Sequence, residues 1–210
     1  MKLGKRSTRF ATMVIALFAL ALAAPSMASA VWTGQADWTY KASWYNYIHV
    51  DWTGPGTQGV HDVIPSSGAS EPSTGVLRHG IDAANTTYNR FTNVGTVALD
   101  GAVRSLNEAH YIDLEFTDPR FVVNGNTGSL TAEALYRPAT MSPPSWGSPT
   151  STGRIAIATF TGLNAIRTTS GTTTTWTGAV PVLTSDASTV FSGSYPAGTA
   201  FGAITISATP

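Results

Sequence analysis

The sequence contains no cysteine, and this absence excludes several kinds of site at once. Disulfides, thiolate metal centres, iron–sulfur clusters and cysteine nucleophiles all need that residue. The stability of the fold must therefore come from packing. Any metal or cofactor must be held by tyrosine, histidine, methionine or carboxylate groups.

Long apolar runs are missing beyond the N-terminus. The run from Met13 to Ala24 follows four basic residues and precedes the small-x-small motif Ala28-Ser29-Ala30. This order is typical of a secretory signal peptide, and the run is shorter than the ~20 residues of a membrane span. We expect residues 1–30 to be a signal peptide and a mature protein from Val31 that is secreted, extracellular or associated with the cell envelope, without a membrane span.

Basic charge is scarce in the expected mature chain. Removal of Lys2, Lys5, Arg6 and Arg9 leaves eight lysines and arginines against twelve acidic residues, a net charge of −4. This composition offers no basic patch for nucleic acid. The remaining length suits one domain with a substantial core.

The mature chain is rich in threonine, serine, glycine, valine and aromatic residues, and it has no extended helical periodicity. Turn signals recur at short intervals along it. This pattern predicts an all-β fold: an antiparallel β-sandwich-like single domain over residues 31–210, with one or two short helical turns.

Several segments alternate with the period of a strand. Residues 95–105 alternate, and His110, Ile112, Leu114 and Phe116 share an apolar face opposite Tyr111, Asp113, Glu115 and Thr117. We expect Asp118-Pro119 to end that strand, 120–124 to begin the next, 125–128 to turn, and 129–136 to complete a hairpin. Residues 138–152 read as a long loop, and further strands are expected at 154–160, 173–180 and 203–207.

The aromatic segment 38–50 fits either a short helix or a strand, and we favour a helical turn. Within it, Tyr47 lies among Trp38, Tyr40, Trp44, Tyr45 and Trp52. Such a crowd is typical of a core or an interface. It could equally supply flat apolar surfaces around a planar ligand.

His110 is the other candidate, because the alternation places it on an apolar face, where an imidazole needs a hydrogen-bond partner or a metal. A core histidine bonded to a backbone carbonyl is the simpler interpretation. Asp113, Glu115 and Asp118 could form a carboxylate site, but the alternation favours a solvated strand face for the first two. His49, His61 and His79 lack metal-ligand spacing, and no G-x-S-x-G motif occurs, so we expect no enzyme.

Three blocks in order resemble the HtaA haem-binding domain of actinobacterial haem uptake. The first is Trp38 to Ile48, and the third is Phe191 to Thr199. The second combines Val97 to Arg104 with His110 to Arg120 and continues into Asn124 to Leu130. Residues 105–109 depart from the family pattern, which has a short aromatic-x-Gly lead-in to the histidine.

The resemblance implies a function and a set of site residues. Tyr47 would be the axial ligand of the haem iron, His110 would hydrogen-bond it, and Tyr195 would lie in the pocket. A phenolate suits ferric iron, so the implied cofactor is ferric haem b. The protein would capture haem, for which haemoproteins are an implied source, and pass it to a cell-surface or membrane receptor.

Two alternatives come from other classes. A secreted carbohydrate-binding or adhesive β-sandwich module would use exposed tryptophans and tyrosines as stacking platforms. A secreted hydrolase is weaker, because the sequence shows no nucleophile or paired carboxylates.

Overall fold

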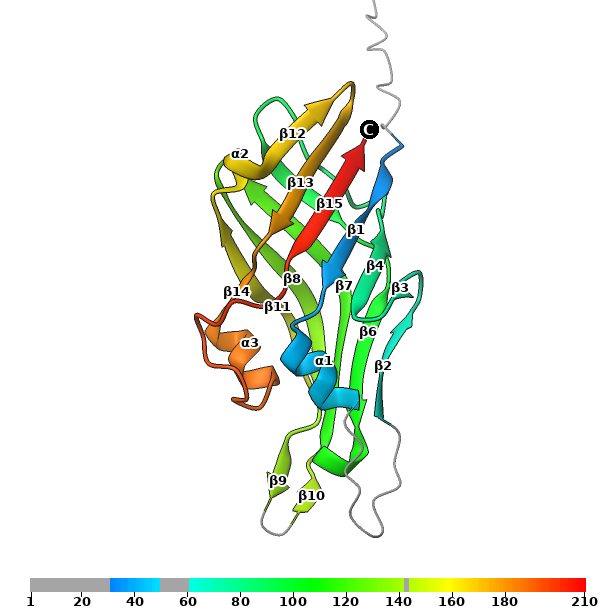
Figure 1. Cartoon of the computed structure of the whole chain (residues 1–210), viewed down its shortest axis with the longest axis vertical. Coiled ribbons are helices and arrows are strands. Elements are labelled where there is room, and N and C mark those ends of the chain that lie inside the picture. The colour runs from blue at the N-terminus through cyan, green and yellow to red at the C-terminus, as the bar shows by residue number, and fades with distance from the viewer. Residues whose placement is uncertain (1–30, 50–60, 142–143) are drawn as a thin grey trace, which may run out of the picture.

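The computed structural model describes residues 31–49, 61–141 and 144–210 (Figure 1). The expected signal peptide, Val50 and Trp52 lie outside the described residues. The described chain is dominated by two antiparallel sheets, and the predicted all-β, sandwich-like architecture is confirmed. No helix among the described residues is long and apolar enough to cross a membrane.

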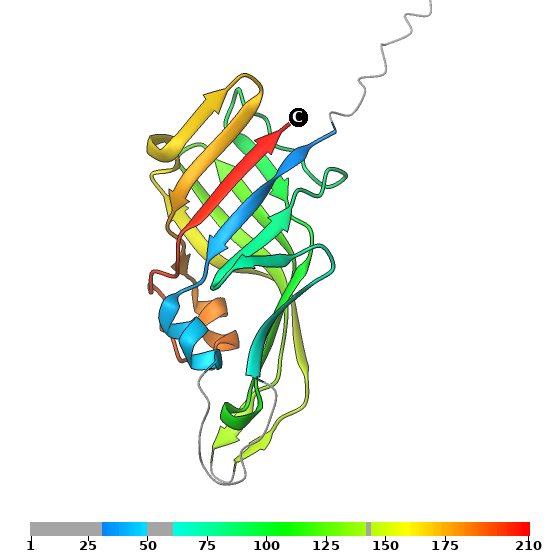
Figure 2. The ribbon, with the colours of Figure 1, turned by 45° about the vertical axis from the view of Figure 1, so that its right-hand side comes forward.

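The first sheet has six strands in the order β12-β13-β15-β1-β4-β3. Their bounds are β1 Thr33–Thr39, β3 Ser70–Ser73, β4 Val76–Gly80, β12 Arg167–Ser170, β13 Thr173–Ala179 and β15 Ile204–Thr209. At the centre, β1 pairs with β15 from Thr33 opposite Thr209 to Trp38 opposite Ile204. The two ends of the described chain therefore lie side by side (Figures 1 and 2).

The second sheet runs in the order β14-β11-β8-β7-β6-β2, and β5 also pairs with β7. Its strands are β2 His61–Ser66, β5 Val94–Ala98, β6 Ala102–Asn107, β7 Ile112–Asn124, β8 Thr127–Tyr136, β11 Thr150–Thr161 and β14 Val182–Leu183. The predicted β7–β8 hairpin is confirmed, with Gly125 in the left-handed region at its turn (φ 63°). Strands also occupy the three further segments expected near 154–160, 173–180 and 203–207.

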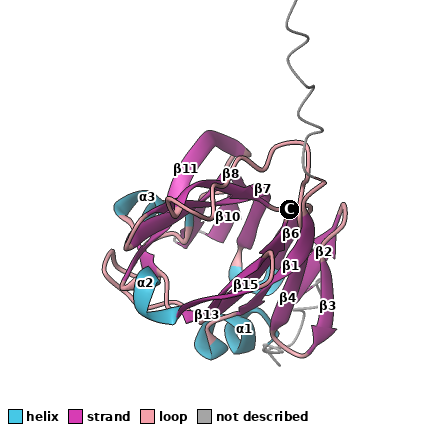
Figure 3. Cartoon of the chain, turned by 90° about the horizontal axis from the view of Figure 1, so that it is seen from above, coloured by secondary structure: helices cyan, strands magenta, loops and turns pink. Residues whose placement is uncertain are grey.

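The core lies between the two sheets, which face each other when seen from above (Figure 3). Phe121 of β7 contacts Trp176 of β13 across the core at 5.2 Å between ring centroids, and it contacts Phe160 of β11 at 5.3 Å. All three side chains are buried. Burial of each large apolar side chain of this kind contributes ~1.5–3 kcal/mol, so packing alone can stabilise a chain without disulfides.

Three local predictions need correction. The segment 95–105 is two strands, β5 and β6, separated at Gly101, which has a positive φ of 100°. Asp118-Pro119 does not end a strand, because β7 continues through it with a register shift between Thr117 and Arg120. The expected loop 138–152 contains a small hairpin of β9 (Ala139–Met141) and β10 (Pro144–Trp146), and β11 already begins at Thr150.

The described chain has four short helical elements, more than the one or two expected: α1 Ala42–His49, the 3₁₀ helix η1 Glu108–His110, α2 Leu163–Ile166 and α3 Ser185–Val190. Helices α1 and α3 lie side by side where the six-stranded sheet ends, and the long strands of the other sheet continue past them (Figures 1 and 2). This end of the sandwich is therefore closed by helices rather than by a second sheet.

Candidate functional site

Helix α1 forms because its apolar residues recur at helical spacing. Trp44 and Ile48 are four residues apart and are 2% and 0% exposed, so they face the core together. On another side of the helix, the rings of Tyr45 and His49 stack at 4.1 Å between centroids. The predicted helical turn is confirmed for 42–49, whereas Trp38 belongs to β1.

Trp44 fixes α1 between the second, seven-stranded sheet and α3. Its indole Nε1 donates a hydrogen bond to Ser105 Oγ on β6 at 3.2 Å. Its ring meets Phe191, which follows α3, edge to face at 4.9 Å. The helix is therefore fixed on two sides, and the next residues along it have a defined position.

A cavity of about 240 Å³ opens beside this contact. Its walls come from α1, from the end of α3, from the start of β7 and from the segment that follows β8. The lining includes Trp44, Tyr47, Ile112, Leu114, Arg137 and Phe191. Aromatic and aliphatic side chains share the walls with polar residues, namely Asp113, Arg137, Ser192 and Ser194, so the cavity is mixed in polarity.

Tyr47 and His110 meet at this cavity. Their ring centroids are 4.6 Å apart and the rings are nearly perpendicular, at 88°. Tyr47 is 39% exposed, an unusual exposure for a large aromatic side chain whose neighbours are buried. Burial, followed by the nearby Tyr195, raises the pKa of the Tyr47 phenol above its ordinary value.

The position of His110 differs from the expected one. The alternation predicted a strand residue on a buried face, but His110 is the last residue of η1 and is half-buried. Tyr111 then takes a left-handed conformation (φ 54°), and β7 begins only at Ile112. The alternation of β7 itself is confirmed, because Leu114 and Phe116 are buried and Asp113 and Glu115 lie on the other face.

Tyr195 lies in the loop after α3 and close to the cavity, but it is not part of the cavity wall. Its hydroxyl is hydrogen-bonded to Ser43 Oγ of α1 at 2.9 Å, and its ring contacts Trp44 at 6.0 Å. The Tyr195 ring also packs on Phe201 at 5.5 Å. The structure therefore places all three predicted residues at one end of the sandwich, with Tyr195 beside Trp44 and outside the cavity wall.

Sequence reasoning missed several residues at this site. Ser43 lies one helical turn before Tyr47, a spacing that would have found it had the helix been certain. Arg137 carries no sequence signal, because it reaches the cavity only through the end of β8. Asn107 was noted only as part of the segment that departs from the family pattern, although it is fully buried between α1 and η1.

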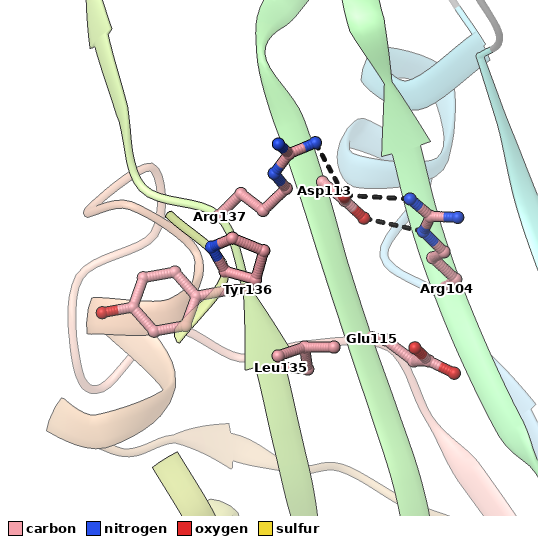
Figure 4. Close-up of a pocket in the computed structure, with 7 residues that line it drawn as sticks. Arg104, Asp113, Glu115, Leu135, Tyr136 and Arg137 are labelled. Carbon is pink, nitrogen blue, oxygen red and sulfur yellow. Dashed lines mark hydrogen bonds and ion pairs between the residues drawn. The ribbon is translucent and has the colours of Figure 1, made fainter. Parts of the chain in front are cut away.

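A second depression, of about 420 Å³, lies on the outer face of β6, β7 and β8 (Figure 4). Arg104 donates two hydrogen bonds to Asp113, at 2.7 and 2.9 Å, and Arg137 Nη1 stands 4.0 Å from the same carboxylate. The pair with Arg104 leaves Asp113 engaged in ion pairing. Glu115 and Asp113 lie on the polar face of β7, but the Asp113 side chain is only 12% exposed and is held by an ion pair rather than solvated as expected.

Metal ligands of the usual kinds do not gather in the described residues. No group of three histidine, aspartate or glutamate side chains there is placed to hold an ion. His79 is buried and its Nδ1 lies 2.8 Å from the Asp100 carbonyl oxygen, and burial lowers its pKa. His49 is paired with Asp62 at 3.2 Å.

The fold and the cavity define a β-sandwich protein with an aromatic ligand pocket at one end. The HtaA family model matches residues 33–207, so the chain belongs to the HtaA family. No curated protein sequence matches the chain.

Solved structures share the fold. The C-terminal domain of HtaA from Corynebacterium glutamicum superposes with a TM-score of 0.68 at 21% identity, covering 84% of this chain and 96% of that one. The haem-binding protein HtaB from the same organism gives 0.64 at 20% identity, covering 85% and 93%. The N-terminal domain of HtaA gives 0.65 at 20% identity, covering 84% and 96%.

Proposed function

We propose that this protein binds one ferric haem through the phenolate of Tyr47, captures it outside the cell and passes it on in haem-iron uptake. The observation that carries this proposal is the pair of Tyr47 and His110, in ring contact at the aromatic cavity. The family of the chain and the haem binding stated for HtaB support it. We propose a binding role rather than an enzymatic one.

The donor set fits ferric haem. A phenolate is a hard, anionic ligand that favours Fe(III) over Fe(II). An imidazole beside it can exchange a hydrogen bond with the phenolic oxygen and so tune its basicity, as outer partners of metal ligands do. His110, at 4.6 Å from the Tyr47 ring, is the residue in position for this role.

The cavity is too small to enclose a porphyrin. At about 240 Å³ it is smaller than the ~300–1,000 Å³ of pockets that enclose a drug-sized ligand. A haem held by Tyr47 would therefore extend beyond the cavity and be only partly covered by the residues that line it. Such partial exposure suits a protein that hands its ligand to a receptor.

Among the described residues, nothing favours the carbohydrate-binding alternative. Stacking platforms must be exposed, but in this part of the chain Trp38, Trp44 and Trp176 are buried and Trp32 and Trp146 are only partly exposed. We propose that residues 1–30 are a signal peptide and that residues 31–210 act outside the cytoplasm, where haemoproteins and a surface or membrane receptor are the proposed partners.

Titration of the chain from Val31 onward with hemin tests the proposal. We expect a saturable Soret shift at one haem per chain, with a tyrosinate-type charge-transfer band, and weaker binding after reduction with dithionite. A titration without saturation would refute haem binding.

The ligand itself is tested by two matched variants. Tyr47→Phe and Tyr195→Phe each lose one hydroxyl and keep the ring, but only Tyr47 is assigned to the iron. We expect Tyr47→Phe to abolish the charge-transfer band and speed haem dissociation much more than Tyr195→Phe does. A Tyr47→Phe protein with an unchanged band would show that another residue is the axial ligand.

A further inference from the structure

Asn107, the last residue of β6, joins the backbones of the two residues that meet at the cavity. Its side chain is fully buried. The amide Nδ2 donates hydrogen bonds to the carbonyl oxygens of Tyr47 and Ile48, at 3.2 and 3.0 Å. The amide Oδ1 accepts a hydrogen bond from the backbone N–H of His110 at 3.0 Å.

Each of these hydrogen bonds satisfies a backbone group that has no partner within its own helix. The last four carbonyl groups of a helix lack partners within it, and α1 has only eight residues, too few to be stable alone in water. Asn107 satisfies two of those carbonyls, including that of Tyr47. The same side chain caps the N-terminus of η1, which ends at His110.

One amide therefore fixes both partners of the ring contact. Loss of the Asn107 amide would free the end of α1 and the end of η1 to move relative to each other, because the same side chain bonds to both.

We propose that Asn107 is the positioning residue that holds the Tyr47 and His110 rings in contact and so sets the strength of iron ligation at Tyr47. The second half of this inference rests on the proposed haem-binding function. The first half, the ring contact, is independent of any ligand.

The structure offers a matched control in Asn93, which is also buried and also forms three hydrogen bonds. Its Nδ2 donates to the Gly125 carbonyl at 2.7 Å and to Asn164 Oδ1 at 2.8 Å. Its Oδ1 accepts from the Tyr88 hydroxyl at 2.9 Å. Strand β7 begins at Ile112, beside the cavity, and Gly125 lies in the turn that follows its other end. Asn93 therefore supports the same sandwich far from the cavity.

The experiment compares Asn107→Ala with Asn93→Ala in the chain from Val31 onward. Without haem, NMR cross-peaks between the Tyr47 and His110 ring protons should be lost in Asn107→Ala and kept in Asn93→Ala. With hemin, we expect Asn107→Ala to speed haem dissociation by ~10–100-fold and to shift the charge-transfer band, as loss of an outer support does for metal ligands. Asn93→Ala should lower the thermal midpoint at least as much, because Asn93 also has a positive φ of 53° that alanine tolerates poorly, and it should leave the band unchanged.

Equal effects of the two variants on the band and on the dissociation rate would overturn the proposal, and so would cross-peaks that survive in Asn107→Ala. If Asn107→Ala does not fold, Asn107→Asp replaces it, because the carboxylate keeps the acceptor for the His110 N–H and removes both donors to α1. Retention of a wild-type band by Asn107→Asp would likewise contradict it. Failure of the wild-type protein to bind hemin would refute the proposed function and leave the ring-contact test intact.

Discussion

Ligation through Tyr47 makes haem affinity depend on pH with a definite sign. Burial and the neighbouring Tyr195 hold the pKa of the Tyr47 phenol above its ordinary value of 10.0, so the phenol of the haem-free protein is protonated from pH 7.5 to 9. Ligation by phenolate then releases about one proton. Affinity should therefore rise with pH by about tenfold per pH unit, equivalent to about 1.4 kcal/mol.

The assay measures hemin dissociation constants of the wild type and of Tyr47→Phe at half-unit steps across this range. The ratio of the two constants at each pH cancels the acid–base chemistry of free haem. It also cancels, to first order, that of the other groups near the cavity, which are His110, Tyr111, Asp113, Arg137 and Tyr195. We expect the dissociation constant of Tyr47→Phe, divided by that of the wild type, to increase by about tenfold per pH unit. A flat ratio would refute the reasoning, because it would mean that no proton leaves the site when Tyr47 binds.

Two further variants separate ligation from folding. We expect His110→Ala to keep the thermal midpoint and to speed haem dissociation by ~10–100-fold; full affinity together with a much lower midpoint would instead identify a structural histidine. Trp44→Ala and Trp176→Ala should each lower the free energy of unfolding by ~3–5 kcal/mol in denaturant titrations, because both side chains are fully buried. Only Trp44→Ala should also weaken haem binding, and equal losses of affinity would contradict the assignment of the cavity.

The sequence predicted the fold class because strand alternation depends on local chemistry. In β7 and β8, burial alternates with the pattern of apolar residues, and Gly125 marks the turn between them. The predicted strand bounds were less accurate where backbone geometry, rather than the residue pattern, determines where a strand ends. Asp118-Pro119 looks like the end of a strand, yet hydrogen bonds from Arg120 and Arg154 to Asp118 hold a bulge there and let β7 continue. Arg154 lies 36 residues from Asp118 in the sequence, so this partner leaves no local signal.

The site shows the same division. A helical turn around Tyr47 could be predicted from the spacing of Trp44 and Ile48, and the family resemblance selected Tyr47, His110 and Tyr195. Residue spacing could not show that these side chains converge, because Tyr47 and His110 are 63 residues apart in the sequence, and His110 and Tyr195 are 85 apart. Only the packing of these elements at one end of the seven-stranded sheet brings the three side chains together.

His110 was selected for a reason that the structure corrects. Strand alternation would have made it a buried residue in line with Leu114, with its ring directed into the core. The left-handed Tyr111 interrupts that alternation and separates His110 from β7. The backbone of His110 is instead held at the end of η1, where its N–H donates a hydrogen bond to the Asn107 amide oxygen. The same amide donates to two carbonyl groups at the end of α1. For this reason we expect a single substitution at Asn107 to disturb the contact between His110 and Tyr47 without loss of the sandwich.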